Sequence, residues 1–399
     1  MNTEVLVINS GSSSIKYQLV DVVSGEALAN GIVERIGLEV GKVKHEGPNG
    51  ETVLEQPVPD HETGMRLVLG LFEQQGPQID EARLTAVGHR IVQGGDVFDG
   101  PAVIDDEVLA QIDALSPLAP LHNPAHVAGI KAARAAFPNV PQVAVFDTSF
   151  HRTMPPAAYT YAIDREIAAK YKIRRYGAHG TSHLYVSRAT AEFLDRPLAD
   201  LNTIVLHLGN GASASAVQGG RCIDTSMGLT PLEGLVMGTR SGDIDPAALF
   251  HLARVGGYTI DQLDELLNRK SGMLGLSGYT DMRDVHAAAE AGDENVRTAL
   301  DVYYHRIKGY VGKYYAELGH VDVITFTAGI GENDDIVRAG ALAGLERLGI
   351  QIDPERNAGR KKQPTVISPD GAEVTVLVIP TNEELEIARQ SVAQVAPAA

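Results

Sequence analysis

Two distant stretches of the chain share one pattern, and this repetition limits the folds that the chain can adopt. Residues 5–20 read VLVINSGSSSIKYQLV, in which an apolar run enters a turn of Asn, Gly and Ser and an alternating run leaves it. Residues 204–217 read IVLHLGNGASASAV and repeat the pattern. Each stretch predicts a β-hairpin whose turn of small residues lets N–H and O–H donors approach a phosphate. An ordinary polar turn explains either hairpin alone, but the repetition favours a duplicated architecture that holds a nucleotide.

Composition narrows the class of protein. The chain has 399 residues, of which 44% are hydrophobic and 21% charged, as is typical of a folded globular protein of two or three domains. A net charge of −17 argues against a nucleic-acid partner or an anionic membrane surface. The single cysteine, Cys222, excludes an intrachain disulfide framework and fits a reducing compartment. With no signal peptide and no apolar run near the ~18 residues of a membrane span, we expect a cytoplasmic protein without a membrane partner.

Strand and helix patterns along the chain predict an α/β protein. We expect strands at 86–92, 142–146, 321–327 and 374–379, and helices at 65–75, 106–115, 125–137, 184–194, 293–318 and 334–348. Residues 174–183, 226–245 and 328–333 are expected to be loops. The pattern of the sequence becomes loop-like after Asp147, which suggests a domain boundary there, with domains at 1–147 and 148–383. The apolar stripe of 293–318, which includes Tyr303, indicates a core or subunit interface rather than a ligand site.

Several common nucleotide and hydrolase motifs are absent from the sequence. It contains neither a phosphate-binding P-loop (GxxxxGK[ST]) nor the dinucleotide GxGxxG motif, and it has neither a GxSxG nucleophile elbow nor an HExxH zinc helix. Two histidine pairs have metal-like spacing, His122 with His126 and His179 with His183. A zinc site needs a third ligand and a general base, and no local sequence supplies them. A zinc-dependent hydrolase is therefore disfavoured.

The remaining signals are those of phosphate chemistry. Glycine-rich turns follow expected strands at 9–14, 94–95, 207–211 and 329–333, and Lys16, Arg90 and Arg240 lie beside or within such turns. Asp147, at the end of a strand, and Glu383, at the start of a helix, are candidate Mg²⁺ ligands. A surface ion pair for either arginine, or a helix cap for either carboxylate, is the simpler alternative. Together these residues indicate phosphoryl transfer, which needs positioned donors, a divalent cation and arginine.

Several longer motifs carry a family resemblance. They are INSGSSSIK at 8–16, YGAHGTSH at 176–183, HLGNG at 207–211, MGTRSGDIDP at 237–246, FTAGIGEN at 326–333 and PTNEEL at 380–385. The chain resembles the acetate kinase family, the group of acetate, propionate and butyrate kinases. The resemblance implies a duplicated actin-like (ribonuclease H-like) βββαβαβα fold of two domains with a cleft between them, the C-terminal helix at about 384–399 completing the N-terminal domain. It also implies reversible, in-line phosphoryl transfer from ATP to acetate, with Mg²⁺ (or Mn²⁺) and usually a homodimer.

The resemblance also implies roles for individual residues. Asn9 and Glu383 are expected to bind Mg²⁺, Arg90 the substrate carboxylate, and Asp147 a magnesium-bound water. His179 and Arg240 are expected to stabilise the transferring phosphoryl group. The acyl group is expected to lie against Val92, Leu121, His122 and Pro231. The phosphates and the nucleotide are expected at Ser12, Ser14, Lys16, His207, Leu208, Gly209, Asn210, Gly211, Asp281, Met282, Arg283, Gly329, Ile330, Gly331, Glu332 and Asn333.

Two alternatives remain open at this point. Some relatives carry Phe at the position of Ala178, and the smaller residue beside His179 could widen the acyl pocket. The order acetate, propionate, butyrate is expected, but a propionate or butyrate kinase is the nearest alternative, since one methylene is worth only ~1–3 kcal/mol of discrimination. A non-enzymatic nucleotide switch of the actin or chaperone type is the second alternative. It does not need Arg90 opposite the phosphates.

Overall fold

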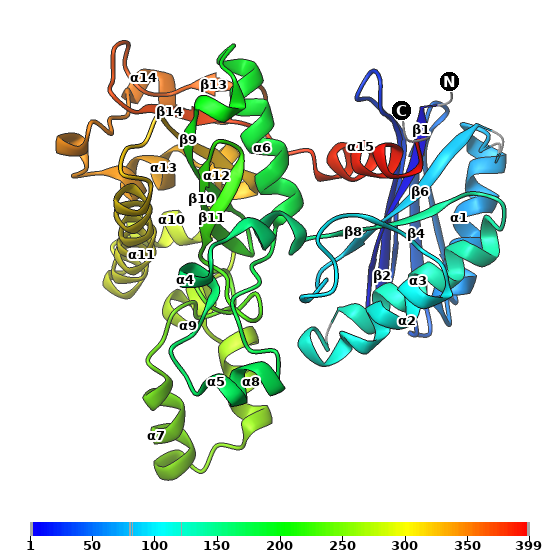
Figure 1. Cartoon of the computed structure of the whole chain (residues 1–399), viewed down its shortest axis with the longest axis horizontal. Coiled ribbons are helices and arrows are strands. Elements are labelled where there is room, and N and C mark those ends of the chain that lie inside the picture. The colour runs from blue at the N-terminus through cyan, green and yellow to red at the C-terminus, as the bar shows by residue number, and fades with distance from the viewer. Residues whose placement is uncertain (1–2, 80, 82, 121, 397–399) are drawn as a thin grey trace. The chain divides into compact units, whose positions relative to one another are not determined.

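The computed structural model describes residues 3–79, 81, 83–120 and 122–396, and it divides into two compact units. Unit 1 comprises Met1–Phe150 with Asn382–Ala399, and unit 2 comprises His151–Thr381 (Figure 1). The expected division at 1–147 and 148–383 is therefore close to the structural one, while the functions assigned to the two parts stay predictions. Leu121, one of the expected acyl-pocket residues, lies outside the described residues.

Unit 1 is built on a mixed sheet whose centre is the first repeated hairpin. The strands are β1 (Glu4–Gly11), β2 (Ser14–Asp21), β3 (Ala27–Glu34), β4 (Gly41–Gly47), β5 (Gly50–Gln56), β6 (Leu84–Ile91), β7 (Ala102–Val103) and β8 (Gln142–Phe146), in the order β5-β4-β3-β2-β1-β6-β8-β7. β1 pairs antiparallel with β2 and parallel with β6, which in turn pairs parallel with β8. Alternation explains the hairpin, because Ile15, Tyr17 and Leu19 are buried while Lys16 between them is exposed.

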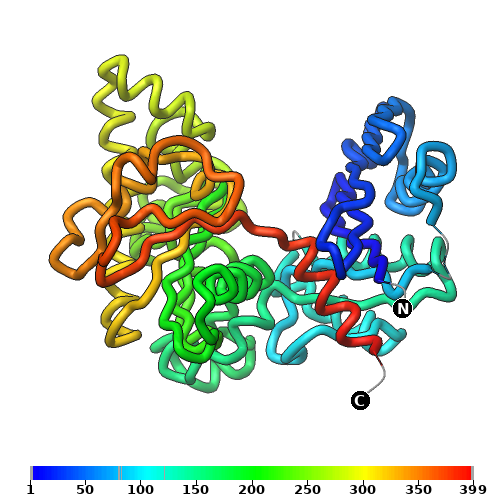
Figure 2. The backbone as a smooth tube through the Cα atoms, turned by 90° about the horizontal axis from the view of Figure 1, so that it is seen from above, coloured from blue at the N-terminus to red at the C-terminus, as the bar shows by residue number. Residues whose placement is uncertain are grey.

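Helices cover both faces of this sheet. They are α1 (His61–Gln75), α2 (Asp106–Ala114), α3 (Asn123–Ala136) and α15 (Glu383–Val395). α1 and α3 form one core with β1 and β2, in which Met65 and Val68 share a cluster with Ile15. α15 packs on the other face, where Gly88 of β6 lies so close that a Cβ atom would be 2.6 Å from Ser391 Oγ. Figure 2 shows α15, in red, beside the blue strands of the N-terminal hairpin.

Unit 2 repeats the core of unit 1. Its strands are β9 (Asn202–Leu208), β10 (Ala212–Gln218), β11 (Arg221–Thr225), β12 (Val323–Thr327), β13 (Thr365–Val366) and β14 (Thr375–Val378), in the order β11-β10-β9-β12-β14-β13. β9 and β10 are antiparallel, whereas β9, β12 and β14 are parallel. The series β11-β10-β9-β12-β14 thus has the same topology as β3-β2-β1-β6-β8. The duplicated α/β fold predicted from the two hairpins is confirmed.

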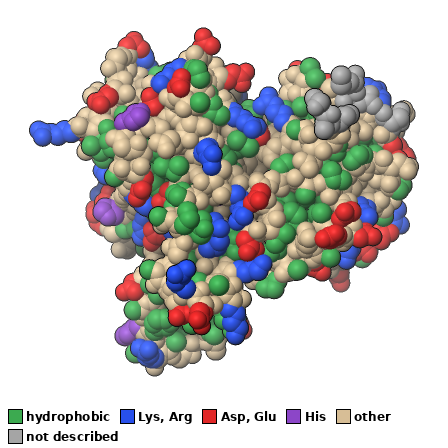
Figure 3. Space-filling model, in the orientation of Figure 1, with side chains coloured by type: hydrophobic (Ala, Val, Ile, Leu, Met, Phe, Trp, Pro, Cys, Tyr) green, Lys and Arg blue, Asp and Glu red, His purple; other side chains and the backbone are tan. Residues whose placement is uncertain are grey.

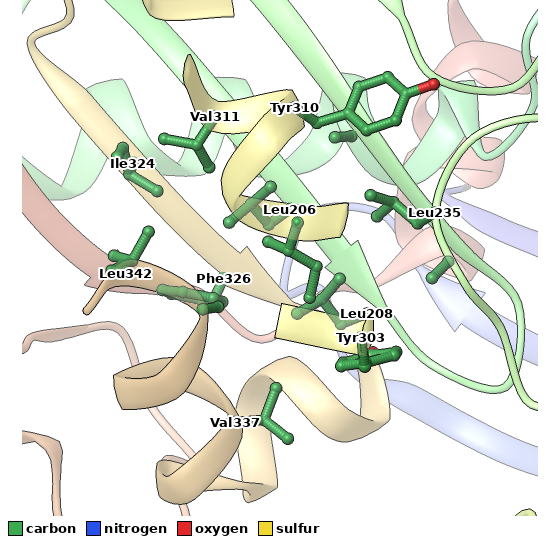
Figure 4. Close-up of a cluster of buried hydrophobic side chains, with 14 of the residues drawn as sticks. Leu206, Leu208, Leu235, Tyr303, Tyr310, Val311, Ile324, Phe326, Val337 and Leu342 are labelled. Atoms are coloured by element: carbon green, nitrogen blue, oxygen red, sulfur yellow. The ribbon is translucent and has the colours of Figure 1, made fainter. Parts of the chain in front are cut away.

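The largest core of the molecule lies on one face of the second sheet. α11 (Glu294–Leu318) and α13 (Asp335–Leu342) pack there against β9 and β12 (Figure 4). The stripe of α11, from Val296 to Tyr314, is buried, so the prediction of a core face is confirmed. The opposite face is covered by α6 (Gly180–Phe193), where Thr190 Oγ1 lies 3.2 Å from Thr325 Oγ1.

The helices that follow the last parallel strand of each core are exchanged. α6 comes after β8 of unit 1 in the sequence, yet it packs on β9 and β12 of unit 2. α15 comes after β14 of unit 2, yet it packs on β1, β6 and β8 of unit 1. Unit 1 therefore needs a helix that follows the whole of unit 2 in the sequence to cover its sheet, whereas the helix on unit 2 directly precedes β9.

Some local expectations were wrong. Residues 180–183 and 328–333, expected as loops, form the start of α6 and the short helix α12 (Ala328–Asn333), and the helix expected to reach 348 ends at Leu342. No helix was expected between 246 and 290, but α7 (Pro246–Gly256), α8 (Ile260–Arg269), α9 (Gly272–Ser277) and α10 (Met282–Glu290) lie there. α8 carries Ile260, Leu263, Leu266 and Leu267 at helical spacing and begins with a capping box, so its sequence did carry a helix signal that was missed. α7 buries no residue, so no core contact marks it as a helix. The remaining short helices are α4 (Pro156–Tyr159), α5 (Arg165–Lys170) and α14 (Pro354–Asn357).

The surface carries charges of both signs. On the face drawn in Figure 3, acidic and basic side chains are interspersed with hydrophobic ones. The net negative charge is therefore spread over that face rather than gathered in one place. Among the residues that the structure describes, no helix is long and apolar enough to cross a membrane.

Candidate active site

The first candidate cluster lies within unit 1, at the carboxyl ends of two parallel strands. Arg90 is the last residue but one of β6, and Asp147 directly follows β8, so the pairing of these strands brings the two side chains together. Arg90 Nε lies 3.1 Å from Asp147 Oδ1, and Arg90 Nη2 lies 2.8 Å from Oδ2. Glu383, the first residue of α15, has its Oε2 3.7 Å from Arg90 Nη1. The sequence predicted all three residues, and the structure brings them together.

The charges of this cluster are strongly coupled. The Asp147 side chain is 2% exposed, against 20% for Arg90 and 18% for Glu383. Burial alone lowers the pKa of Arg90, but the charges of Asp147 and Glu383 outweigh it and raise that pKa. Burial raises the pKa of Glu383, and the positive charge of Arg90 partly offsets this rise. A bound cation would further stabilise the charged form of Glu383.

The turn of the first hairpin presents its polar groups to solvent. Asn9 of β1 pairs with Lys16 of β2, and Gly11 pairs with Ser14. Ser12 and Lys16 are exposed, and the Gly11 carbonyl accepts a hydrogen bond of 2.8 Å from His61 Nε2. Asn9 and Lys16 also line a cavity of about 380 Å³ on the sheet face. These donors are therefore available to a phosphate, as the sequence predicted for this hairpin.

The loop after β6 is fixed by residues that sequence reasoning missed. The Val92 amide donates to His126 Nε2 at 3.3 Å, and Gly94 N donates to Thr148 Oγ1 at 3.0 Å. Asn123 Nδ2 donates to the Gln93 carbonyl at 3.1 Å. Burial lowers the pKa of His126 to about 3, so its ring is neutral and can accept the Val92 hydrogen bond. Asn123 and His126 belong to the NPAH segment directly after His122. Their closeness in the sequence to this expected acyl-pocket residue is the signal that could have identified them.

The second candidate cluster is a group of histidines in unit 2. His179 has a left-handed backbone (φ 57°, ψ 21°) directly before α6, a conformation that is uncommon for residues other than glycine. Its Nδ1 lies 2.9 Å from Ser213 Oγ, and His183 Nε2 lies 2.8 Å from the same oxygen. The rings of His179 and His207 are stacked with centroids 4.2 Å apart. Ser213 of β10, which the sequence analysis did not single out, thus connects His179 to the α6 residue His183.

Arg240 and His179 converge on the turn of the second hairpin. A Cβ atom on Gly211 would lie 3.4 Å from His179 Nε2 and 3.6 Å from Arg240 Nη2, so both side chains border the space beside this glycine. Arg240 Nη1 donates to the Pro231 carbonyl at 2.8 Å. Burial lowers the pKa of Arg240, and within the described part of the chain no carboxylate forms an ion pair with it. This guanidinium is available to an anion.

Unit 2 also contains a cavity of about 420 Å³. Seven of the residues predicted to hold the nucleotide line it: Asn210, Asp281, Met282, Arg283, Gly329, Ile330 and Asn333. Six further lining residues were missed: Gly238, Met273, Thr280, Tyr303, Asp334 and Arg360. Half of the missed residues come from the region where no helix was expected (Met273 and Thr280) and from α11 (Tyr303), whose stripe was assigned to the core.

Several predicted nucleotide residues have another role in the structure. Leu208 is fully buried in the core, so its side chain cannot reach a ligand in this structure. Glu332 Oε1 accepts from the Ala328 amide at 2.8 Å and from the Thr381 amide at 3.0 Å. The Ala328 amide, at the N-terminus of α12, is therefore occupied by Glu332 and is not free to bind an anion. Gly209, Gly331 and His207 lie on or next to β9 and α12 but do not line the cavity.

The residues predicted for Mg²⁺ are chemically suitable. Asn9 and Glu383 supply oxygen donors, which hard divalent cations prefer. No group of three or more His, Cys, Asp or Glu residues that could hold a metal occurs among the described residues. Mg²⁺ commonly binds through one or two carboxylates together with waters and substrate phosphates, so a small protein ligand set fits this ion.

The duplicated sheet, the arginine–carboxylate cluster and the glycine-bounded cavity define a phosphotransferase of the actin-like class. The chain belongs to the acetokinase family, whose model matches residues 4–389. It is 61% identical to an acetate kinase of Leifsonia xyli subsp. xyli, over 98% of this chain and 99% of the relative. It is 57% identical to an acetate kinase of Streptomyces avermitilis, over 99% of this chain and 98% of the relative.

Solved structures agree with this assignment. The crystal structure of Porphyromonas gingivalis acetate kinase has a TM-score of 0.95 at 42% identity and covers 99% of this chain and 100% of its own. A propionate kinase from Francisella tularensis has a TM-score of 0.90 at 40% identity and covers 97% of this chain and 98% of its own. Because kinases for both acids share the fold, the fold alone does not identify the acyl substrate.

Proposed function

We propose that this chain is an acetate kinase, which transfers the γ-phosphoryl group of ATP reversibly to the carboxylate of acetate and forms acetyl phosphate and ADP. The observation that carries the proposal is the match to acetate kinases at 61% identity over 98% of the chain. The residues of the two clusters are consistent with this reaction, because phosphoryl transfer depends mainly on the positioning of the reactants and on the stabilisation of charge.

In unit 1, Arg90 binds the carboxylate of the acid. Asp147 binds the Nε/Nη2 edge of the Arg90 guanidinium, leaving Nη1 directed toward Glu383. Asp147 is also proposed to orient a magnesium-bound water, and Asn9 and Glu383 to hold Mg²⁺, with Mn²⁺ as a substitute. When bound, the cation neutralises charge on the phosphates. Val92 and His122, together with Leu121 and Pro231, are proposed to contact the acyl group.

In unit 2, His179 and Arg240 stabilise the charge of the transferring phosphoryl group. Both side chains border the open space at Gly211, and Arg240 has no carboxylate that competes with a phosphate within the described residues. The cavity at Asn210, Asp281 and Asn333 takes the nucleoside. Ser12, Ser14 and Lys16 of unit 1 supply further donors to phosphate oxygens.

Acetate needs no strong base because it is already an anionic nucleophile. The main electrostatic problem is the repulsion between acetate and the phosphates of ATP. Arg90 and Arg240, with the cation, reduce this repulsion, and a single arginine in such a role is worth about 10³–10⁵ in rate. Direct in-line transfer is the simplest mechanism that uses these groups.

The test is trapping of the acyl phosphate with hydroxylamine. Purified protein is incubated with ATP, Mg²⁺ and formate, acetate, propionate or butyrate, and the acyl hydroxamate is measured. We expect the highest kcat/KM with acetate, then propionate, then butyrate. Absence of hydroxamate with every acid, in the presence of Mg²⁺ or Mn²⁺, would refute the proposed reaction.

A propionate or butyrate kinase is the second candidate. Ala178 is buried beside His179 and leaves more room than an aromatic residue at this position. The similarity to the Francisella propionate kinase shows that the same fold serves a longer acid in a relative. A kcat/KM for propionate or butyrate above that for acetate would establish this alternative.

We also propose that the protein is a cytoplasmic homodimer. The single cysteine is buried, as suits a protein that needs no disulfide. Light scattering after size-exclusion chromatography should give twice the 42.5 kDa mass of the chain. A mass equal to one chain over a range of concentrations would contradict the dimer.

A further inference from the structure

A residue in the wall of the unit 2 cavity carries a buried hydroxyl for which the described residues supply no partner. Tyr303 belongs to α11 and is 1% exposed, and it lines the cavity that we propose for the nucleotide. Its hydroxyl forms no hydrogen bond within the described residues. Figure 4 shows the ring in the same cluster as Leu208 and Val337. Buried hydroxyls nearly always have a partner, so one that lacks it in the wall of a ligand cavity indicates a partner on the ligand.

Three other polar side chains of the cavity wall are already engaged. Asp334 bonds to His286 Nε2 at 2.8 Å and to the Val337 amide at 2.9 Å. Asn333 donates to the Gly329 carbonyl at 2.7 Å, and it accepts from Arg360 Nε at 2.8 Å. Asp281 forms an ion pair with Arg283. The Tyr303 hydroxyl therefore differs from these groups in having its hydrogen-bonding capacity unused.

The surroundings of Tyr303 favour a neutral heterocycle over a phosphate. Burial raises the pKa of Tyr303, and the nearby charge of Asp334 raises it further, so the hydroxyl stays protonated and can donate and accept. The carboxylate of Asp334 would repel a phosphate at this position. Met273, Met282 and Ile330 supply apolar walls, which suit the face of a nucleobase.

We propose that the Tyr303 hydroxyl hydrogen-bonds to a polar edge of the nucleobase and is a residue that determines nucleotide specificity. The inference rests on the proposed function, in which this cavity takes the nucleoside. Because ATP, GTP and CTP arrange donors and acceptors differently around the base, a hydrogen bond to that edge contributes unequally to the three.

The neighbouring residue provides a matched control. Tyr304 also has a buried hydroxyl without a partner in the described part of the chain, and burial likewise raises its pKa. It lines a different cavity of about 620 Å³, at Asp335 and Ile350. Tyr303→Phe and Tyr304→Phe therefore remove the same group from the same helix, but only the first removes it from the nucleotide cavity.

The experiment compares kcat/KM for ATP, GTP and CTP at saturating acetate in the parent, Tyr303→Phe and Tyr304→Phe. For Tyr303→Phe we expect a three- to tenfold loss with the best nucleotide, about what one hydrogen bond is worth, through a higher nucleotide KM. We also expect the ratio between nucleotides to change at least about threefold, with the acetate KM unchanged. Tyr304→Phe should keep the parental ratios.

Thermal unfolding adds a second measurement that does not depend on turnover. Without ligand, Tyr303→Phe should match the parent Tm, because the hydroxyl has no partner to lose. With ADP, its Tm increase should be smaller than that of the parent or of Tyr304→Phe. Unchanged nucleotide ratios in Tyr303→Phe, or a lower Tm without ligand, would overturn the inference while leaving the kinase activity of the parent intact. A parent without activity toward any acid would instead refute the proposed function.

Discussion

Arg90 and Asp147 form a bidentate ion pair, with Arg90 Nε 3.1 Å from Asp147 Oδ1 and Nη2 2.8 Å from Oδ2. The pair orients the guanidinium, because the carboxylate binds its Nε/Nη2 edge through two N–H groups and is itself almost fully buried. Asp147 can thus contribute to substrate binding through Arg90 in addition to its proposed role toward a magnesium-bound water.

Removal of Arg90 should abolish most activity. In Arg90→Ala, kcat/KM for acetate should fall by at least about 10³, the lower bound for an arginine that stabilises phosphoryl transfer. The variant should also be destabilised by roughly 3–5 kcal/mol, because Asp147 is left as an uncompensated buried charge. Hydroxamate kinetics and urea unfolding measure the two effects. Arg83→Ala is the control, since the Arg83 side chain is 63% exposed and pairs with Glu4 at the surface.

A double variant separates the two effects of Arg90. Arg90→Ala with Asp147→Asn removes the unpaired charge, so part of the lost stability should return while activity stays low. Activity within tenfold of the parent in either variant would contradict the proposed role of Arg90.

Ser213 should affect turnover through His179. Its Oγ lies within 2.9 Å of both His179 Nδ1 and His183 Nε2. Loss of one such hydrogen bond is worth about 1 kcal/mol, so Ser213→Ala should lower kcat about five- to tenfold by allowing His179 to move. Ser215→Ala is the control, because Ser215 is also buried on β10 but bonds to Thr225 Oγ1. Equal effects of the two variants on kcat would show that Ser213 has only a structural role.

The Glu383 carboxylate should set the requirement for the metal. In Glu383→Gln, the Mg²⁺ concentration for half-maximal activity should rise at least about tenfold, because a neutral amide replaces an anionic ligand. Titration of activity with Mg²⁺ and Mn²⁺ measures the change. Glu55→Gln alters an exposed carboxylate on β5 of unit 1 and should leave the requirement unchanged. A parental Mg²⁺ dependence in Glu383→Gln would remove this residue from the metal site.

His89 should make unit 1 sensitive to acid. Burial lowers the pKa of His89 to about 4, and its Nε2 lies 2.8 Å from Gln142 Oε1. The unfolded chain takes up this proton below about pH 6.5, whereas the folded chain does so only near pH 4. The contribution of His89 to the free energy of unfolding is therefore fully present above pH 6.5. Roughly 3 kcal/mol of it is lost as the pH drops to 4.

The variant His89→Gln tests this dependence. Glutamine does not titrate in this range, so the loss of unfolding free energy between pH 7 and pH 4 should be smaller than in the parent by about that amount. Urea denaturation at both pH values gives the difference. A parental pH dependence in His89→Gln would assign the acid sensitivity to other groups.

Much of the fold followed from local patterns. Alternation of apolar and polar residues on either side of a glycine and serine turn predicts a hairpin, and its recurrence predicted the duplicated core that the structure shows. The sequence also predicted the end of β8 at Phe146, directly before Asp147, because a short apolar run followed by polar residues indicates where a buried strand ends. α8 was missed although its apolar spacing and its capping box are local signals. α7 lies on the surface and buries no residue.

The sequence by itself therefore determined the family, the two hairpins and the positions of the chemically useful residues, because these depend on motifs and on short-range periodicity. Only the tertiary structure decided which of them meet. Arg90 reaches Asp147 through the parallel pairing of β6 with β8, and Glu383 joins them because α15, which follows β14 in the sequence, packs on the sheet of unit 1. Tyr303 likewise belongs to a stripe that reads as core, and only the packing of α11 places it in a cavity wall. Such contacts join residues far apart in the sequence, and strand register and helix packing fix them.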